Sequence, residues 1–516
     1  MTILLSFRFF LPQLLYVSFL LVGYSSLAQQ PDLKIISPEQ AKEDLELLKE
    51  VLEAIHPSLY LHQTKKEWEQ LHDTIYNRID IPMNSKDFID MVSPLVRSIR
   101  CGHTQLRLEE DLVNWSTTKL LPFYGSYLNR ELYVGNSLDS ILPAEAVIRS
   151  IDDESSSTLI HKIVNSALLN SDGYDDRFIY GAFQNKNFHL FYNYFYPDKD
   201  SVQLIFSIGK TIDTIQVATI TLDSFQNYEG NKNKITTIND SIFLSLSEQD
   251  TLDWSPIYFE HKKFKVRIKT ILVASLYQHK RKKEVARLSL SGFQNGQLKF
   301  YKWLFPKLKS IGIKHLILDL RGNLGGSVRS AKHILEYLVD SSYQITFHEK
   351  RYKRNIKNRL RKSFLFYAKM QLDLRSQVKT KRKNGEKYFE LKIKPKKKYH
   401  FEESLYVLID GSTFSAAALT SAYLKEDGRG IFFGTETGGN RNYTNGGIYK
   451  ILPFPASGTV LVIPKYYLNH HLKTMTIGRG VLPDYEIPLS EKDLLKDSDK
   501  ILSKVLDFIE KNPAIN

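Results

Sequence analysis

The amino-acid sequence predicts a multidomain α/β protein, and three observations support this class. The chain has 516 residues, which is long enough for several domains. Its hydrophobic content of 42%, with 12% aromatic residues, is typical of a globular protein with large cores. Apolar strands and amphipathic helices alternate in the second half of the chain, as they do in layered α/β domains.

The first 28 residues have the features of a signal peptide. Arg8 precedes an apolar run over residues 11–24, and Ser26 and Ala28 place small side chains at the −3 and −1 positions of a cleavage site. A membrane anchor is the alternative, but the run is short for a membrane span. We therefore expect an exported protein, periplasmic or extracellular after cleavage. The single cysteine, Cys101, excludes an intramolecular disulfide, and we interpret it as a small buried apolar residue.

Residues 29–118 are predicted to form a helical N-terminal domain. Ser37 and Gln40 have the spacing of a capping box, and apolar residues follow at helical intervals up to about residue 100. Residues 119–215 change to alternating strands around one helix and predict a separate β-rich module. Within this module we expect the aromatic segment 188–208 to form strands.

The later segments complete the division of the chain. Residues 216–285 continue with β-type alternation as a connecting region. Residues 286–490 are predicted to form an α/β domain interrupted by an insertion at 346–400, and residues 491–516 a C-terminal helix. Within the α/β domain, residues 315–321 and 405–409 are buried strands, each followed by a turn and a helix.

The net charge of +14 comes from one segment. Residues 350–398 hold 20 Lys and Arg and three acidic residues, so the rest of the chain has a net charge of −3. The first half of this segment could form a basic helix, and the second half is predicted to form a β-hairpin around Asn384-Gly385. We interpret it as a solvated insertion, with peripheral contact to an anionic surface as the next alternative and nucleic acid as an unlikely partner.

Ser415 is the first candidate for a chemical role. It follows a buried strand and the turn Asp410–Thr413, and it opens a helix rich in Ala and Leu. The N-terminus of a helix offers unpaired N–H groups and a positive dipole end, and both favour a developing oxyanion. The alternative is that Ser412 or Thr413 only caps the helix and that Ser415 fills its first turn.

Two further segments carry candidate residues. The turn Gly322-Asn323-Leu324-Gly325-Gly326 follows a buried strand, and its glycines let backbone N–H groups approach a ligand. It could bind an oxyanion or a phosphate, or be a plain tight turn, but it lacks the spacing of the known phosphate loops. His103, in Gly102-His103-Thr104, is a candidate base, although a single loop histidine is more often structural.

In this order, these segments resemble the tail-specific, or C-terminal-processing, serine proteases of peptidase family S41, with the tricorn-like branch included. The resemblance rests on four segments: the strand ending in Asp319-Leu320-Arg321, with its glycine turn; Ser415 followed by small residues; the turn 435–440; and the late Gly478-Arg479-Gly480-Val481-Leu482-Pro483-Asp484 segment. It implies a PDZ-like module at 119–215 and a crotonase-like (ββα spiral) catalytic domain. It also implies a peptide or protein substrate engaged at its C-terminus, and no cofactor or metal.

The resemblance implies roles for individual residues. Ser415 matches the nucleophile, and the N–H groups of Ala416 and of Gly325 or Gly326 match the oxyanion hole. Asn440 stands where one branch has a catalytic lysine, and asparagine cannot accept a proton from serine, so His103 is the expected general base. Glu436 and Asp484 are both candidates for the acid that orients His103, although relatives often carry Glu at the position of Leu482.

Two other functions remain as alternatives. A catalytically silent peptide-binding protein of the same fold would explain the missing lysine and the unassigned acid. A different acyl-transfer enzyme with a crotonase-like core is the second alternative, and an exported location argues against it.

Overall fold

The computed structural model describes residues 35–108, 119–221, 253–257, 274–350, 381–491 and 499–512, with short gaps inside these ranges and a few residues between them. The predicted signal peptide and the first half of the basic segment lie outside the described residues. None of the described helices is long and apolar enough to cross a membrane.

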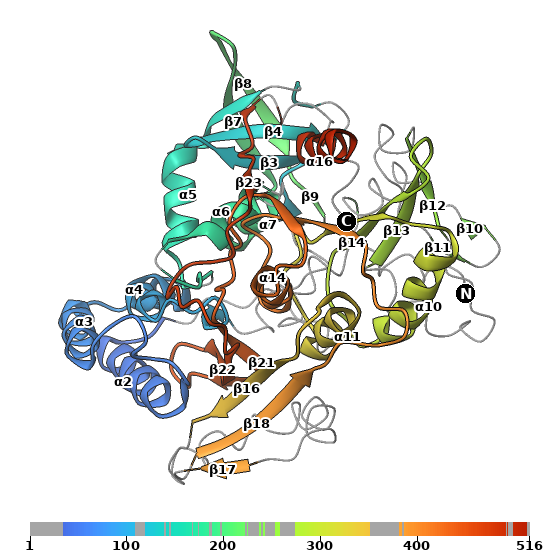
Figure 1. Ribbon diagram of the computed structural model, residues 1–516. Helices are drawn as coiled ribbons and strands as arrows, with labels where there is room; N and C mark the ends of the chain where they lie inside the picture. The colour runs from blue at the N-terminus through green and yellow to red at the C-terminus, as the bar shows by residue number, and fades with distance from the viewer. Residues whose placement is uncertain are drawn as a thin grey trace, which may run out of the picture.

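The N-terminal region is helical, as predicted, and contains α2 (Pro38–Ile55), α3 (Lys65–Arg78) and α4 (Ser85–Ser98). Ser37 and Gln40 form the expected capping box at the start of α2. The apolar faces of the helices share one core with Leu461 and Ile463 of β22 (Thr459–Asn469). Figure 1 shows these helices in blue beside β21 (Tyr443–Pro453) and β22, so the first and last parts of the chain pack together.

The sheet under these helices joins distant parts of the sequence. It runs in the order β1 (Gln105–Leu108), β22, β16 (Tyr343–Glu349), β18 (Glu386–Ile393) and β17 (Lys381–Lys383), and β21 pairs with β22. β17 and β18 form an antiparallel hairpin in which Lys383 pairs with Glu386. The hairpin predicted in the basic segment is therefore confirmed, and it extends a sheet of the folded core.

The β-rich module has a six-stranded antiparallel sheet with helices packed on it. The strands are β3 (Phe123–Leu128), β4 (Glu131–Ser137), β5 (Val147–Ile151), β6 (Glu154–Ser155), β7 (Ser201–Ile208) and β8 (Thr211–Ala218). The helices are α5 (Ser156–Asn165), α6 (Arg177–Gln184) and α7 (Phe188–Phe195). A short ladder pairs β2 (Lys119–Leu120) with β9 (Ile220–Thr221).

One element of this module differs from the expectation. The aromatic segment 188–195 was expected to be a strand, but it forms α7. Phe188, Phe191, Tyr192 and Phe195 recur at helical spacing, and all four are buried in the core of the module. A short, strongly apolar run does not distinguish a strand from a buried helix, and tertiary packing decides between them.

The α/β domain is built on a seven-stranded sheet. Its order is β12 (Trp254–Pro256), β13 (Ala274–His279), β14 (Val285–Leu290), β15 (His315–Asp319), β19 (Ser404–Ile409), β20 (Ile431–Gly434) and β23 (Tyr485–Glu486). The strands from β14 to β23 are parallel, whereas β12 and β13 add an antiparallel edge. The predicted connecting region therefore contributes two strands to this sheet. Another two-stranded ladder, β10 (Thr237–Ile238) with β11 (Ser241–Ile242), precedes it.

Helices cover both faces of this sheet. α10 (Gln297–Ser310), α11 (Val328–Leu338) and α14 (Ala416–Glu426) share the largest core with one face. The C-terminal α16 (Lys500–Lys511) packs on the other face, against Ile317, Tyr406 and Phe433. β19 is followed in the chain by α14, which Figure 1 shows near the middle of the molecule, between the helical region, the module and the α/β domain.

Candidate active site

Ser415 lies at a strained turn between a strand and a helix. β19 ends at Ile409, and Ser415 is the N-cap residue of α14 with φ 49° and ψ −120°. A non-glycine residue with this conformation is costly and persists only where the surroundings fix it. Asp410 helps to fix it, because its carboxylate accepts hydrogen bonds from the backbone N–H groups of Gly322 and Ser412 at 3.0–3.1 Å.

The glycine turn lies directly against Ser415. Gly325 has φ +103°, and a Cβ atom built on it would lie 2.6 Å from Cβ of Ser415 and 2.8 Å from N of Ala416. Only glycine fits this contact, since any side chain would collide with the serine. The backbone of the turn is also held to the nucleophile turn by a hydrogen bond from Phe414 N–H to Asn323 O at 3.0 Å.

Of the candidate oxyanion donors, one N–H group already donates a hydrogen bond within the described part of the chain and two do not. The N–H of Gly325 donates to Oδ1 of Asn323 at 2.8 Å. The N–H groups of Gly326 and Ala416 donate to no described residue. Of the two glycines that the sequence left open, Gly326 is therefore the one with an available donor.

His103 lies at Ser415 although 312 residues separate them in the sequence. Nε2 of His103 is 3.1 Å from Oγ of Ser415. His103 lies in the loop between α4 and β1. Because β1 pairs with β22, this loop lies beside the later part of the chain that contains Ser415. The distance is that of a nucleophile hydrogen-bonded to its base.

Aromatic rings and burial set the charge of His103. Its ring stacks with that of Phe414, with centroids 4.8 Å apart, and with that of Tyr449, with centroids 5.9 Å apart. This burial lowers the pKa of His103 to about 3, because the charged imidazolium is poorly solvated there. The imidazole is therefore neutral at pH 7 and has a lone pair that can accept a proton.

The two acids proposed to orient His103 are engaged elsewhere. Glu436 accepts hydrogen bonds from Arg479 and from the N–H of Gly480, the latter at 2.7 Å. Asp484 pairs with Lys425 and accepts the N–H of Phe432 at 2.8 Å. Neither carboxylate bonds to His103, so both serve to hold surrounding loops together.

A different carboxylate lies beside His103. Asp172 comes from the loop between α5 and α6, and it is 1% exposed. Its Oδ1 accepts the N–H of Gly102 at 2.8 Å. Nothing in the local sequence marks this residue, because its neighbours Ser171, Gly173 and Asp175 form an ordinary polar loop.

Cys101, His103 and Asp172 form a group of residue types that bind metals, with donor atoms within 4.8 Å of one another. A metal would need the Cys101 thiolate. Burial raises the pKa of this thiol to about 12, which opposes thiolate formation. The amide of Asn445 donates to the sulfur at 3.3 Å. We therefore interpret the cluster as the buried polar surroundings of His103, and Cys101 as a buried structural residue.

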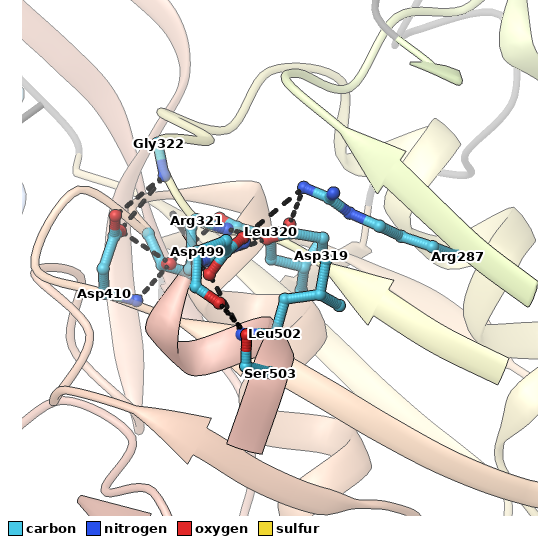
Figure 2. Close-up of polar contacts among 10 residues, drawn as sticks. Arg287, Asp319, Leu320, Arg321, Gly322, Asp410, Asp499, Leu502 and Ser503 are labelled. Atoms are coloured by element: carbon cyan, nitrogen blue, oxygen red, sulfur yellow. Dashed lines mark hydrogen bonds and ion pairs between the residues drawn. The ribbon is translucent and has the colours of Figure 1, made fainter. Parts of the chain in front are cut away.

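The Asp319-Leu320-Arg321 segment has a structural role. Figure 2 shows Arg321 between the carboxylates of Asp319 and Asp499, with Arg287 on the other side of Asp319. The two arginines hold the pKa of Asp319 well below its usual range, even though burial alone would raise it. Asp499 also caps α16 by accepting the N–H of Leu502 at 2.9 Å. This network ties the C-terminal helix to the strand that leads into the glycine turn.

Comparison with known proteins places this site in a family. Residues 284–487 match the model of peptidase family S41. The structure of mature CPAF complexed with lactacystin is similar, with a TM-score of 0.59 and 14% identity over 92% of this chain and 98% of that chain. Mature CPAF alone gives the same TM-score and identity over 92% and 97%. The photosystem II D1 C-terminal processing protease has a lower TM-score of 0.40, at 14% identity over 90% and 98%. None of the curated proteins matches the chain.

The fold, the strained serine at a helix start and the family match define this protein as a serine peptidase. At 14% identity, the likeness to CPAF shows a shared fold. The match to peptidase family S41, the family of the tail-specific proteases, covers the α/β domain that carries Ser415.

Proposed function

We propose that this protein is an exported serine endopeptidase in which Ser415 is the nucleophile and His103 is the general base and acid. The observation that carries the proposal is the distance of 3.1 Å between Oγ of Ser415 and Nε2 of His103. Asn440, at the position of the lysine in the other branch, is buried and its Oδ1 accepts the N–H of Asn442. An amide cannot act as a base, so the histidine carries the proton transfer.

The reaction follows from this geometry. As Oγ of Ser415 attacks the scissile carbonyl carbon, its proton moves to Nε2 of His103. The carbonyl oxygen becomes an oxyanion and is bound by the N–H groups of Ala416 and Gly326, the first of which opens α14. The proton then passes from Nε2 to the leaving amine, and water repeats the sequence to release the acyl group.

Substrate capture and location are part of the proposal. The β-rich module, PDZ-like under the family resemblance, would hold the C-terminus of a peptide or protein substrate. The predicted signal peptide supports export. The basic segment around the β17–β18 hairpin supports peripheral contact with an anionic surface.

The test uses a serine-reactive fluorophosphonate probe and hydrolysis of dye-labelled casein. Ser415→Ala should abolish both signals, and His103→Ala should reduce both by about 10⁴-fold or more. Ser421→Ala is the matched control, because this buried serine lies on the same helix and bonds only to the carbonyl of Ala417 among the described residues. Full activity in Ser415→Ala, or loss in Ser421→Ala alone, would reject the assignment.

A catalytically silent peptide-binding protein is the second candidate. Its support is that neither Glu436 nor Asp484 orients His103. The wild-type protein would then fold normally and bind peptides, but Ser415 would not react with the fluorophosphonate.

A further inference from the structure

We infer that Asp172, a residue of the β-rich module, is the positioning residue that accepts the Nδ1 proton of His103 during the reaction. This inference rests on the proposed function, because it concerns the same serine and histidine. It assigns the third member of the catalytic set to a residue outside the α/β domain.

The first observation is a matched pair of unsatisfied atoms. Nδ1 of His103 and Oδ2 of Asp172 are both buried, and neither has a hydrogen-bond partner among the described residues. A ring nitrogen of His103 and a carboxylate oxygen of Asp172 lie within 4.8 Å of each other. Buried donors and acceptors are nearly always paired, so these two unsatisfied atoms on neighbouring side chains are candidates for one contact. In the inferred contact, one bridging water or a small rotation of the imidazole ring would join Nδ1 to Oδ2.

The second observation is that the other atoms of both side chains are already committed. Nε2 of His103 faces Ser415, which leaves Nδ1 for an orienting group. Oδ1 of Asp172 accepts the N–H of Gly102, the residue before His103, at 2.8 Å. Asp172 is therefore fixed to the backbone beside His103, and its Oδ2 has no partner among the described residues.

The chemistry requires such a group. His103 can accept the Ser415 proton at Nε2 only if its own proton is on Nδ1, and an acceptor at Nδ1 selects this tautomer. When Nε2 gains the proton, the ring becomes an imidazolium with Nδ1–H directed at the carboxylate. Burial disfavours that cation, so an adjacent negative charge lowers the barrier to forming it.

The groups around Asp172 set its charge. Burial raises its pKa to about 7, while the N–H groups of Gly102 and Asn440 and the charge of Arg177 act in the opposite direction. The Cys101 thiol also faces it and stays neutral. A polar pocket of about 280 Å³ is lined by the neighbouring residues Ser171 and Gly173. With a pKa of about 7, Asp172 is partly ionised at neutral pH.

The test compares Asp172→Asn with the wild type in the full-length protein. Asparagine keeps the shape and can still accept the N–H of Gly102, but its amide group would donate to Nδ1 and favour the wrong tautomer. We expect kcat on labelled casein to fall at least about 100-fold, with KM changed less than about threefold. Asp176→Asn, in the same loop but paired with Arg97, is the control and should keep near-wild-type kcat.

A second measurement is the pH profile of fluorophosphonate labelling. The wild-type rate should rise through an apparent pKa near 7, whereas Asp172→Asn should label slowly and with no step in this range. Equal kcat and equal profiles for both proteins would overturn the inference while Ser415 still labels. Absence of labelling in the wild type would instead reject the proposed function itself. Loss of wild-type activity on adding EDTA would also overturn the inference, since it would assign the cluster to a metal.

Discussion

Replacing Gly325 by alanine tests whether the glycine turn positions the nucleophile. The new Cβ would lie 2.6 Å from Cβ of Ser415, whereas carbon atoms in ordinary contact are about 3.5–4.0 Å apart. The serine or the turn must therefore move by about 1 Å. A displacement of this size at a reacting group lowers the rate by about 100-fold.

The effect on folding should be smaller than the effect on chemistry. A side chain at φ +103° strains the backbone by about 1–3 kcal/mol. Gly428→Ala is the matched control, because Gly428 has φ +69° just beyond the other end of the same helix, and a Cβ there meets no atom within 4 Å. It should lose about 1–2 kcal/mol of stability and none of the reactivity of Ser415.

The assay pairs the second-order rate of fluorophosphonate labelling with urea unfolding of each variant. Gly325→Ala should label about 100-fold more slowly than the wild type under conditions where at least nine-tenths of the protein is folded. If Gly325→Ala and Gly428→Ala label at the same rate, the contact between the turn and Ser415 does not control the chemistry, and the reasoning is refuted.

Three other perturbations have defined outcomes. Asp499→Ala removes an ion pair to Arg321 and the cap of α16, so urea unfolding should show a loss of about 2–4 kcal/mol, and an unchanged midpoint would contradict the role of the network. Phe178→Ala removes a buried ring whose centroid is 4.2 Å from that of Phe414. It should lower the free energy of unfolding by about 3 kcal/mol and also slow the labelling of Ser415. If only the stability falls, packing of the module against Phe414 does not affect the active site. The pKa of Asp172 is raised on folding, so its contribution to stability is complete below about pH 4 and is lost as the pH rises through about 7. The free energy of unfolding of Asp172→Asn, relative to that of the wild type, should therefore increase by on the order of 3 kcal/mol from pH 5 to pH 8. If this difference does not change with pH, Asp172 is not a neutral buried acid at pH 5.

The sequence predicted the elements that short-range patterns specify. The capping box at Ser37, the hairpin between β17 and β18 and the strand–turn–helix at Ser415 all depend on residues close together in the chain. The pair of Ser415 and His103 came from the resemblance to a family, because no local pattern connects residues 312 positions apart.

The remaining features depend on tertiary packing. The segment 188–195 is apolar enough to form either a strand or a helix. It forms a helix because in this conformation its apolar side chains pack against α5 and β3. Asp172 lies in a loop whose composition is unremarkable, and only folding brings it beside Gly102. Glu436 and Asp484 lie in segments that resemble the family's motifs, but their carboxylates are bound by Arg479 and Lys425 and not by His103.

The position of Phe414 has a consequence for the order in which this protein becomes active. The residue before Ser415 belongs to the core of the β-rich module, and its ring also stacks on His103. During synthesis the chain makes His103 first, then the module, and Ser415 long afterwards. The hydroxyl of Ser415, the imidazole of His103 and the ring of Phe414 therefore meet only where all three parts of the chain have folded together.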